Sequence, residues 1–184
     1  SRQIEEKLVE LNPRHMKSMS MILEPGYCLR AANLLGDAKG NIIIGTGFPV
    51  AGTFETDGPV GAMVLYRALE EMGCTPWIAS EPILKTALEQ DYRTIELTID
   101  DAQNAEASAN EILAKLKPNL VLSIERPGKT KDGNYYNMRS EKINSEVAVF
   151  DPFIELSKCP TIGIGDGGNE IGMGNLYSSL KALQ

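Results

Sequence analysis

Five short runs of apolar or β-branched residues recur along the chain, with segments of helical length between most of them. The runs occupy residues 42–46, 76–80, 94–99, 120–125 and 161–165. Strand-length runs that alternate with helix-length segments are typical of βαβ units, whose strands pair in parallel through right-handed connections. The sequence therefore predicts an α/β fold, a mainly parallel, Rossmann-like three-layer sandwich.

The segments between the runs carry residues that start and end helices. The pairs Gly58-Pro59 and Asp151-Pro152 each mark a helix start, and Asp100 or Asp101 is expected to cap a further helix that Pro118 ends. In parallel sheets of this kind ligands bind beyond the carboxyl ends of the strands. We therefore look for a functional site in the loops that follow the runs.

Residues 1–35 are predicted to form an additional helical segment. Their apolar side chains recur at helical spacing, at Ile4, Leu8, Leu11, Met16, Met19 and Met21. Methionines at such a spacing are more typical of a packed core than of a cofactor site. The chain of 184 residues contains no repeat or linker, so residues 1–184 are expected to form a single α/β domain.

Composition excludes several classes of function. A net charge of −7 disfavours a nucleic-acid partner, and no apolar run approaches the roughly 20 residues of a membrane span. The spacing of Cys28, Cys74 and Cys159 fits neither a zinc site nor a disulfide framework and indicates a reducing compartment. With His15 as the single histidine, Ser-His-Asp, Cys-His and HExxH chemistry within this chain is excluded.

Glycine gathers in two loops that each follow a predicted strand. Residues 45–61 hold five of the 17 glycines and residues 163–174 hold six. Such loops can bind an anion through backbone N–H groups, or they are simply tight turns. Thr53 and Phe54 replace the residues of a Walker A loop, and Asp166 would repel a pyrophosphate at the GxGxxG spacing, so no nucleotide cofactor is expected.

The two glycine loops also carry oxygen ligands. These are Glu55 and Asp57 in the first loop, and Asp166, Asn169 and Glu170 in the second. Carboxylates and amides without histidine or cysteine suit Mg²⁺, Mn²⁺ or Ca²⁺. Taken singly, Asp57 could instead cap a helix and Asp166 could stabilise a turn.

A basic segment follows the fourth predicted strand and its terminal Glu125. Residues 126–142 contain five basic and two acidic residues in an otherwise acidic chain. This contrast predicts a small anionic substrate, with Arg126 or Arg139 binding a carboxylate through both arms of its guanidinium. The alternative is a solvated loop, but its two tyrosines and two asparagines beside Glu125 favour a lid or specificity loop.

Four motifs occur in one order along the chain. They are GTGFPV at 45–50, ETDGP at 55–59 with Gly61-Ala62, ERPG at 125–128 with DGNYYN at 132–137, and GDGGNE at 165–170 with Gly172-Met-Gly174. In these motifs the chain resembles the C-terminal domain family of D-glutamate cyclase. The resemblance covers nearly the whole chain. It implies a lyase that converts D-glutamate to 5-oxo-D-proline and water with a divalent metal ion, Mn²⁺ or Mg²⁺.

The resemblance, together with the inventory of polar residues, leads to a set of expected roles. We expect Glu125 to act as the base, with Asp166 as a second catalytic residue, and Asp57, Asp166 and Glu170 to bind the metal. The residues expected to bind substrate are Gly45, Thr46, Gly47, Thr56, Arg126, Asn134, Tyr135 and Asn137. Two alternatives stay open, a sugar-phosphate or nucleotide-binding α/β enzyme and a non-catalytic metabolite-binding domain.

The resemblance also bears on partners and location. Family members continue past the last glycine-rich motif, so a C-terminal portion of the domain is expected to be missing here. Besides small anionic D-glutamate, the expected partners are a second copy of the chain or a separate C-terminal fragment. Neither nucleic acid nor membrane is an expected partner. The expected location is the cytoplasm, with the mitochondrial matrix as the alternative.

Overall fold

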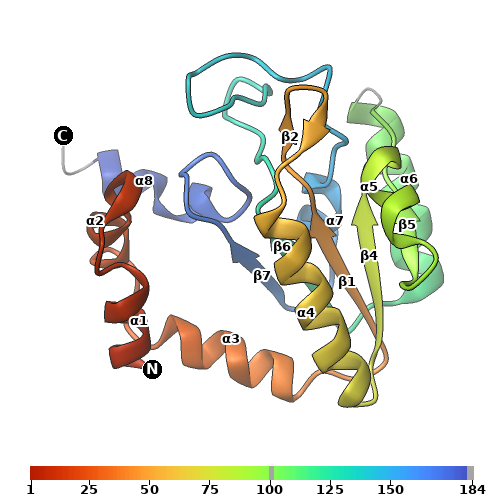
Figure 1. Cartoon of the computed structure of the whole chain (residues 1–184), viewed down its shortest axis with the longest axis horizontal. Helices are drawn as coiled ribbons and strands as arrows, with labels where there is room; N and C mark the ends of the chain where they lie inside the picture. Colours follow the sequence, from red (N-terminus) through yellow and green to blue (C-terminus); the bar gives the residue numbers. More distant parts are fainter. Residues whose placement is uncertain (100–101, 182–184) are drawn as a thin grey trace.

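The computed structural model describes residues 1–99 and 102–181 and is built around a five-stranded sheet (Figure 1). Every strand pair in this sheet is parallel, and the spatial order is β5-β4-β1-β6-β7. The strands are β1 (Asn41–Thr46), β4 (Thr75–Ser80), β5 (Thr94–Glu96), β6 (Leu120–Ile124) and β7 (Thr161–Ile164). All five correspond to predicted runs.

The strand order places a topological switch point next to the central strand. Along the chain the sheet grows from β1 through β4 to β5 on one side, and then restarts on the other side with β6 and β7. Connections therefore diverge at the carboxyl ends of β1 and β6, which is where open α/β sheets form a ligand crevice. The predicted Rossmann-like α/β fold is confirmed.

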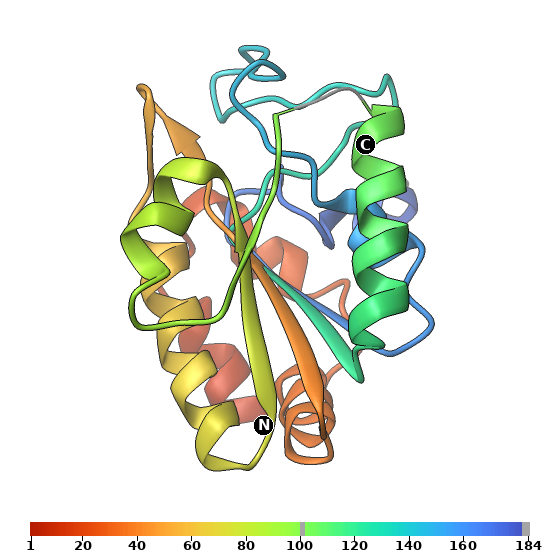
Figure 2. The same cartoon turned by 90° about the vertical axis from the view of Figure 1, so that its right-hand side faces the viewer.

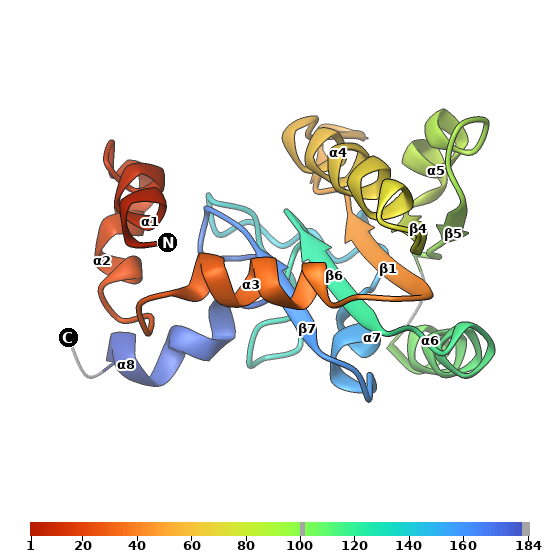
Figure 3. The same cartoon turned by 90° about the horizontal axis from the view of Figure 1, so that it is seen from below.

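Helices cover both faces of the sheet (Figures 2 and 3). The helices are α3 (Tyr27–Gly36), α4 (Asp57–Glu71), α5 (Pro82–Leu88), α6 (Ala102–Leu116) and α7 (Asp151–Glu155). Successive strand side chains point to opposite faces, so Ile42 and Ile44 pack in the core with α3, α4 and α5, whereas Ile43 packs in the core with α6 and α7. Each of these three isoleucines is completely buried, as expected for a strand covered on both faces.

The helix boundaries agree with the sequence in part. Helix α4 starts at Asp57, beside the predicted Gly58-Pro59. The cap predicted for α6 at Asp100 or Asp101 lies outside the described residues. Helix α7 starts at Asp151, as the pair Asp151-Pro152 predicts. Its N-cap is Phe150 and not the aspartate, whose carboxylate accepts a hydrogen bond from Lys129 N at 2.8 Å.

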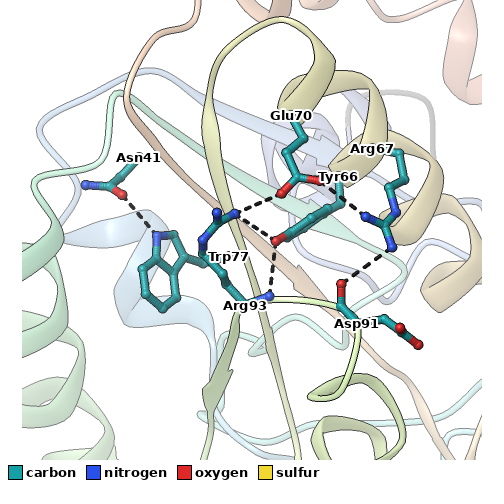
Figure 4. Close-up of polar contacts among 7 residues, drawn as sticks. All are labelled: Asn41, Tyr66, Arg67, Glu70, Trp77, Asp91 and Arg93. Carbon is teal, nitrogen blue, oxygen red and sulfur yellow. Dashed lines mark hydrogen bonds and ion pairs between the residues drawn. The ribbon is translucent and has the colours of Figure 1, made fainter.

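Hydrogen bonds and an ion pair connect α4 to the segment between α5 and β5 (Figure 4). The Tyr66 hydroxyl accepts hydrogen bonds from Arg93 N at 3.1 Å and from Arg93 Nη1 at 3.0 Å. Arg93 Nη1 also contacts Glu70 Oε1 at 3.0 Å, while Arg67 stacks over the Tyr92 ring at 4.7 Å. This network fixes the far end of α4, whose first turn lies at the switch point.

The N-terminal segment lies to one side of the sheet, close to the C-terminal helix in the views of Figures 1 and 3. It consists of α1 (Arg2–Leu8), a 3-10 turn η1 (Pro13–His15) and α2 (Met16–Ser20); the chain ends in a second 3-10 turn, η2 (Met173–Leu176), and α8 (Tyr177–Lys181). The predicted helical character is confirmed.

The packing predicted for the N-terminal segment is wrong. Its apolar residues Leu8 and Leu11 are 66% and 91% exposed, and Met21 is 81% exposed. Helix α1 ends at Leu8, so Leu11 lies beyond it, and helical spacing of apolar residues does not by itself place a second element over them. In the described part of the chain, no helix has the length and apolarity to cross a membrane.

Candidate functional site

Three loops end at the same edge of the sheet. Because β1, β6 and β7 run in parallel, the segments that follow them leave from their common carboxyl ends. These are residues 45–61, 125–139 and 163–174. The first loop includes a short antiparallel hairpin, β2 (Pro49–Val50) with β3 (Thr53–Phe54). The predicted convergence of these three loops is confirmed.

Backbone pairing brings the second and third loops into direct contact. Gly128 N donates to Asn169 O at 2.9 Å, and Ile171 N donates to Arg126 O at 2.9 Å. A Cβ atom at Gly128 would lie 2.9 Å from Ile171 N and 3.0 Å from Glu170 O. Glycine at this position therefore permits an approach that places Glu170 beside the end of β6.

Glu125, Asp166 and Glu170 form an acidic cluster at this edge. One oxygen from each side chain lies within 4.8 Å of the others. Glu170 is 5% exposed, and its Oε1 accepts hydrogen bonds from Gly167 N at 2.6 Å and Asp166 N at 3.3 Å. Its Oε2 is buried and has no hydrogen-bond partner among the described residues. A buried carboxylate oxygen without a donor, facing two further carboxylates, fits a divalent cation.

Glu125 has the most perturbed environment of the acidic cluster. It follows β6 with a φ of +48°, a left-handed conformation that is uncommon for residues other than glycine and that concentrates at functional sites. Burial, followed by the negative charges of Glu170 and Asp166, raises its pKa to about 8. The side chain can therefore exchange a proton near neutral pH.

The carboxylates of Asp57 and Glu55 lie near the acidic cluster but are not part of it. Asp57, predicted as a metal ligand, lies in the first turn of α4, and its Oδ1 accepts a hydrogen bond from Gly58 N at 3.0 Å. The structure does not bring it into the group of Glu125, Asp166 and Glu170. Burial and the charge of Asp57 raise the pKa of Glu55. The surrounding carboxylates therefore strengthen the negative potential at the cluster.

A cavity of about 760 Å³ opens over the acidic cluster, between the β2–β3 hairpin and residues 137–146. Its charged lining residues are Arg14, Glu55, Glu125, Arg139, Glu141, Lys142, Glu146 and Glu170. Basic groups thus line a site that is predominantly acidic. Such a lining suits a small molecule that carries both an ammonium and a carboxylate group.

Arg126, which is predicted to bind a substrate carboxylate, lies in the interior of the protein. Its side chain is 1% exposed, and Nη1 donates to Glu81 Oε2 at 2.8 Å and to Thr46 O at 2.9 Å. Nη2 donates to Ala148 O. Arg126 is absent from the cavity lining, because its guanidinium is buried against Glu81, Thr46 and Ala148. Its guanidinium thus contacts β1, the residue that follows β4 and the segment before α7.

The first glycine motif also serves packing. A Cβ at Gly45 would lie 2.4 Å from the Phe150 ring, and one at Gly47, where φ is +106°, would lie 2.4 Å from Glu81 Oε1. Thr46 is completely buried and Thr56 is the N-cap of α4. None of these four residues lines the cavity, and their contact with substrate stays a prediction.

The asparagines and tyrosine of the loop 132–137 mostly hold the loop itself. Tyr135 is 4% exposed and its hydroxyl donates to Asp151 Oδ2 at 2.5 Å, while Asn134 Oδ1 accepts from Asn144 Nδ2 at 3.2 Å. Neither residue lines the cavity, and their contact with substrate stays a prediction. Asn137 does line it, although its Nδ2 donates to Glu141 Oε2 at 2.7 Å.

Sequence reasoning missed two charged residues of this region. Glu81 directly follows β4, as Glu125 follows β6, and this position after a strand could have identified Glu81 as a candidate residue. Arg14 reaches the site from η1, and its Nη1 forms an ion pair with Asp166 Oδ1. The signal here was Pro13-Arg14-His15, a basic interruption within a segment read as helix.

Comparison with known proteins agrees with this architecture. The family model described as D-glutamate cyclase-like, C-terminal, matches residues 6–184. The human protein named D-glutamate cyclase, mitochondrial, is 31% identical over 199 residues, which cover 96% of this chain and 32% of the human protein. The chain thus spans about a third of the length of this curated relative. A family match over residues 6–184, nearly the whole chain, shows that the chain belongs to the D-glutamate cyclase-like C-terminal family.

Proposed function

We propose that this chain is a lyase that cyclises D-glutamate to 5-oxo-D-proline with loss of water. The carrying observation is the acidic cluster of Glu125, Asp166 and Glu170 at the switch point of the sheet, in a chain of this family. The substrate comes from the name of the human relative. The mitochondrial location in that name favours the mitochondrial matrix over the cytoplasm for this chain.

In the proposed reaction the α-nitrogen bonds to the γ-carbon and one C–O bond of the γ-carboxyl group breaks. The substrate ammonium carries three protons; the lactam nitrogen keeps one, and two leave with the γ-oxygen as water. The ammonium group must therefore lose a proton before it attacks. Glu125 takes this proton, because its raised pKa matches it to a base that works near neutral pH.

Asp166 and Glu170 are the residues that would hold Mn²⁺ or Mg²⁺ in this proposal. Oxygen ligands suit either ion, and the unpartnered Oε2 of Glu170 is the observation that supports it. When bound, the cation would make the γ-carboxyl carbon more electrophilic. The cavity holds the two reacting groups of one molecule together, and ring closure gains on the order of 7 kcal/mol or more from such positioning in favourable cases.

The lining of the cavity weighs against the sugar-phosphate and nucleotide alternative. Five of its eight charged residues are glutamates, which would repel a phosphate ester. The non-catalytic alternative needs an experiment, because binding without turnover would leave the same cavity.

Turnover is tested by incubating D-glutamate with the protein and Mn²⁺ and separating the products by chiral chromatography. We expect 5-oxo-D-proline from D-glutamate, and a loss of about 100-fold or more in kcat for Glu125→Gln, which keeps shape but removes the base. Glu71→Gln, an exposed change on α4, is the matched control and should retain activity. Wild-type protein that binds D-glutamate without forming product would instead be a metabolite-binding domain.

A further inference from the structure

Arg14 is held in the site by an unusual stretch of backbone. Asn12, Arg14 and His15 have φ angles of +48°, +51° and +60°, so three non-glycine residues within four positions are left-handed. Such conformations are disfavoured for L-residues and persist where surrounding contacts impose them. Here the strained stretch carries a guanidinium to an acidic cluster 152 positions away in the sequence.

The N-terminal segment meets the third loop at two points. Arg14 Nη1 pairs with Asp166 Oδ1, and Met19 Cε lies 3.6 Å from where a Cβ of Gly168 would be. Arg14 lines the cavity, and its side chain is 46% exposed. Its positive charge acts to lower the pKa of both Glu55 and Glu125, against the other causes that raise them. Arg14 is therefore close enough to influence the protonation of both groups.

Other basic residues of the region are less suited to bind a substrate carboxylate at the cluster. Arg126 is buried, and its Nη1 and Nη2 already donate to Glu81, Thr46 and Ala148. Arg139 and Lys142 line the cavity from the segment 137–146. Among the described residues, neither forms an ion pair with a member of the acidic cluster. Arg14 pairs with the cluster through Nη1, which leaves further N–H donors of the guanidinium for a ligand.

We propose that Arg14 binds the α-carboxylate of the substrate, the carboxylate that does not react. This inference rests on the proposed function, in which the γ-carboxyl group and the amine must face the acidic cluster. A guanidinium beside that cluster can pair with the remaining carboxylate through two parallel hydrogen bonds. Arg14 thus takes the role that the sequence suggested for Arg126.

The proposal predicts a particular kinetic signature. The α-carboxylate is present in D-glutamate and unchanged in 5-oxo-D-proline, so Arg14 would bind substrate, transition state and product alike. Loss of an interaction of this uniform kind raises KM and leaves kcat nearly unchanged. A base or a metal ligand would instead alter kcat or the affinity for Mn²⁺.

The test compares ligands with and without the α-carboxylate. Dissociation constants of D-glutamate and 5-oxo-D-proline, and of 4-aminobutanoate and 2-pyrrolidinone, which lack that group, are measured by NMR titration in the presence of diamagnetic Mg²⁺, with Glu125→Gln present in every protein so that no ligand reacts. The variants are Arg14→Gln, Arg14→Lys and the control Arg2→Gln, which removes an exposed ion pair with Glu6 in the same segment. Melting temperatures are recorded for every variant.

We expect Arg14→Gln to weaken binding of D-glutamate and 5-oxo-D-proline by about tenfold or more. Arg14→Lys should lose less, and the two ligands without the α-carboxylate should bind each variant as they bind the wild type. Unchanged binding of D-glutamate in both Arg14 variants, or an equal loss for all four ligands, would overturn the assignment. Wild-type protein that binds neither D-glutamate nor 5-oxo-D-proline would overturn the proposed function itself, and the assignment with it.

Discussion

Arg126 and Glu81 form an ion pair whose side chains are only 1% and 11% exposed. The guanidinium also holds backbone carbonyls of β1 and of the segment before α7, so a single side chain joins three parts of the chain. A buried charge that keeps its partner is tolerated, whereas one that loses it is strongly destabilising. The pair therefore contributes to the shape of the site through the fold.

Arg126→Gln should accordingly lower the free energy of unfolding by about 3–5 kcal/mol, because it leaves Glu81 buried without its cation. Chemical denaturation measures the change. Arg139→Gln is the matched control, since this exposed arginine should change stability by no more than about 0.5 kcal/mol. An unfolding free energy equal to that of the wild type, together with weaker D-glutamate binding, would return Arg126 to the role of a ligand-binding residue.

Glu125 makes stability depend on pH in an uncommon direction. Its carboxyl group ionises near pH 4.5 in the unfolded chain and near pH 8 in the folded one. Between these values the folded state binds more protons, so stability present below pH 4.5 is lost as the pH rises toward about 8. The free energy of unfolding in the presence of a chelator should fall by at most about 1.4 kcal/mol per pH unit from this group.

Urea denaturation at a series of pH values from 4.5 to 8 tests this dependence. Glu125→Gln carries no titrating group at this position, so its unfolding free energy should decline less steeply than that of the wild type. Equal slopes for the two proteins would show that Glu125 ionises normally in the folded state.

At the scale of elements, glycine permits β7 to approach the segment that returns after it. A Cβ at Gly163 would lie 2.8 Å from Ile171 O and 3.1 Å from Gly172 Cα, and both contacts are with backbone. Gly163→Ala should therefore cost about 1–3 kcal/mol, because the loop that carries Glu170 must move. Gly36→Ala, at a position with open space, is the control and should cause no loss in thermal denaturation. A melting temperature for Gly163→Ala equal to that of the control would contradict the close packing.

The elements themselves could be predicted from local sequence. The run Ile42–Ile44 reads as a buried strand, and parallel strands necessarily place their following loops at one edge. The side-chain contacts could not be predicted in the same way. Arg126 and Glu125 are adjacent in sequence, yet Arg126 is buried against Glu81 whereas Glu125 belongs to the acidic cluster. The difference depends on Glu81, which lies 45 positions from Arg126.

The helical spacing of apolar residues likewise predicts helices, but it does not predict which elements pack against them. Leu8 is the last residue of α1 and Leu11 lies in the turn that follows it, and both side chains are exposed. Arg14 was missed for a related reason, because an ion pair with Asp166 joins positions too distant for any local pattern to connect. Contacts across long sequence separations are thus where reading from sequence fails in this protein.

At the scale of the whole molecule, the fold concentrates negative charge at the carboxyl edge of the sheet. The chain has a net charge of −7, and Glu55, Asp57 and the acidic cluster of Glu125, Asp166 and Glu170 lie near one another there. Such an arrangement attracts cations from solution and stabilises them once bound. We therefore expect Asp166 and Glu170 to hold a divalent cation beside the base Glu125.

Calorimetric titration measures the affinity for Mn²⁺ of the wild type, Asp166→Asn, Glu170→Gln and the exposed control Asp91→Asn. We predict that each of the first two variants binds Mn²⁺ about tenfold more weakly or worse, while the control keeps wild-type affinity and all four proteins keep similar melting temperatures. Wild-type affinity in both Asp166→Asn and Glu170→Gln would contradict the account.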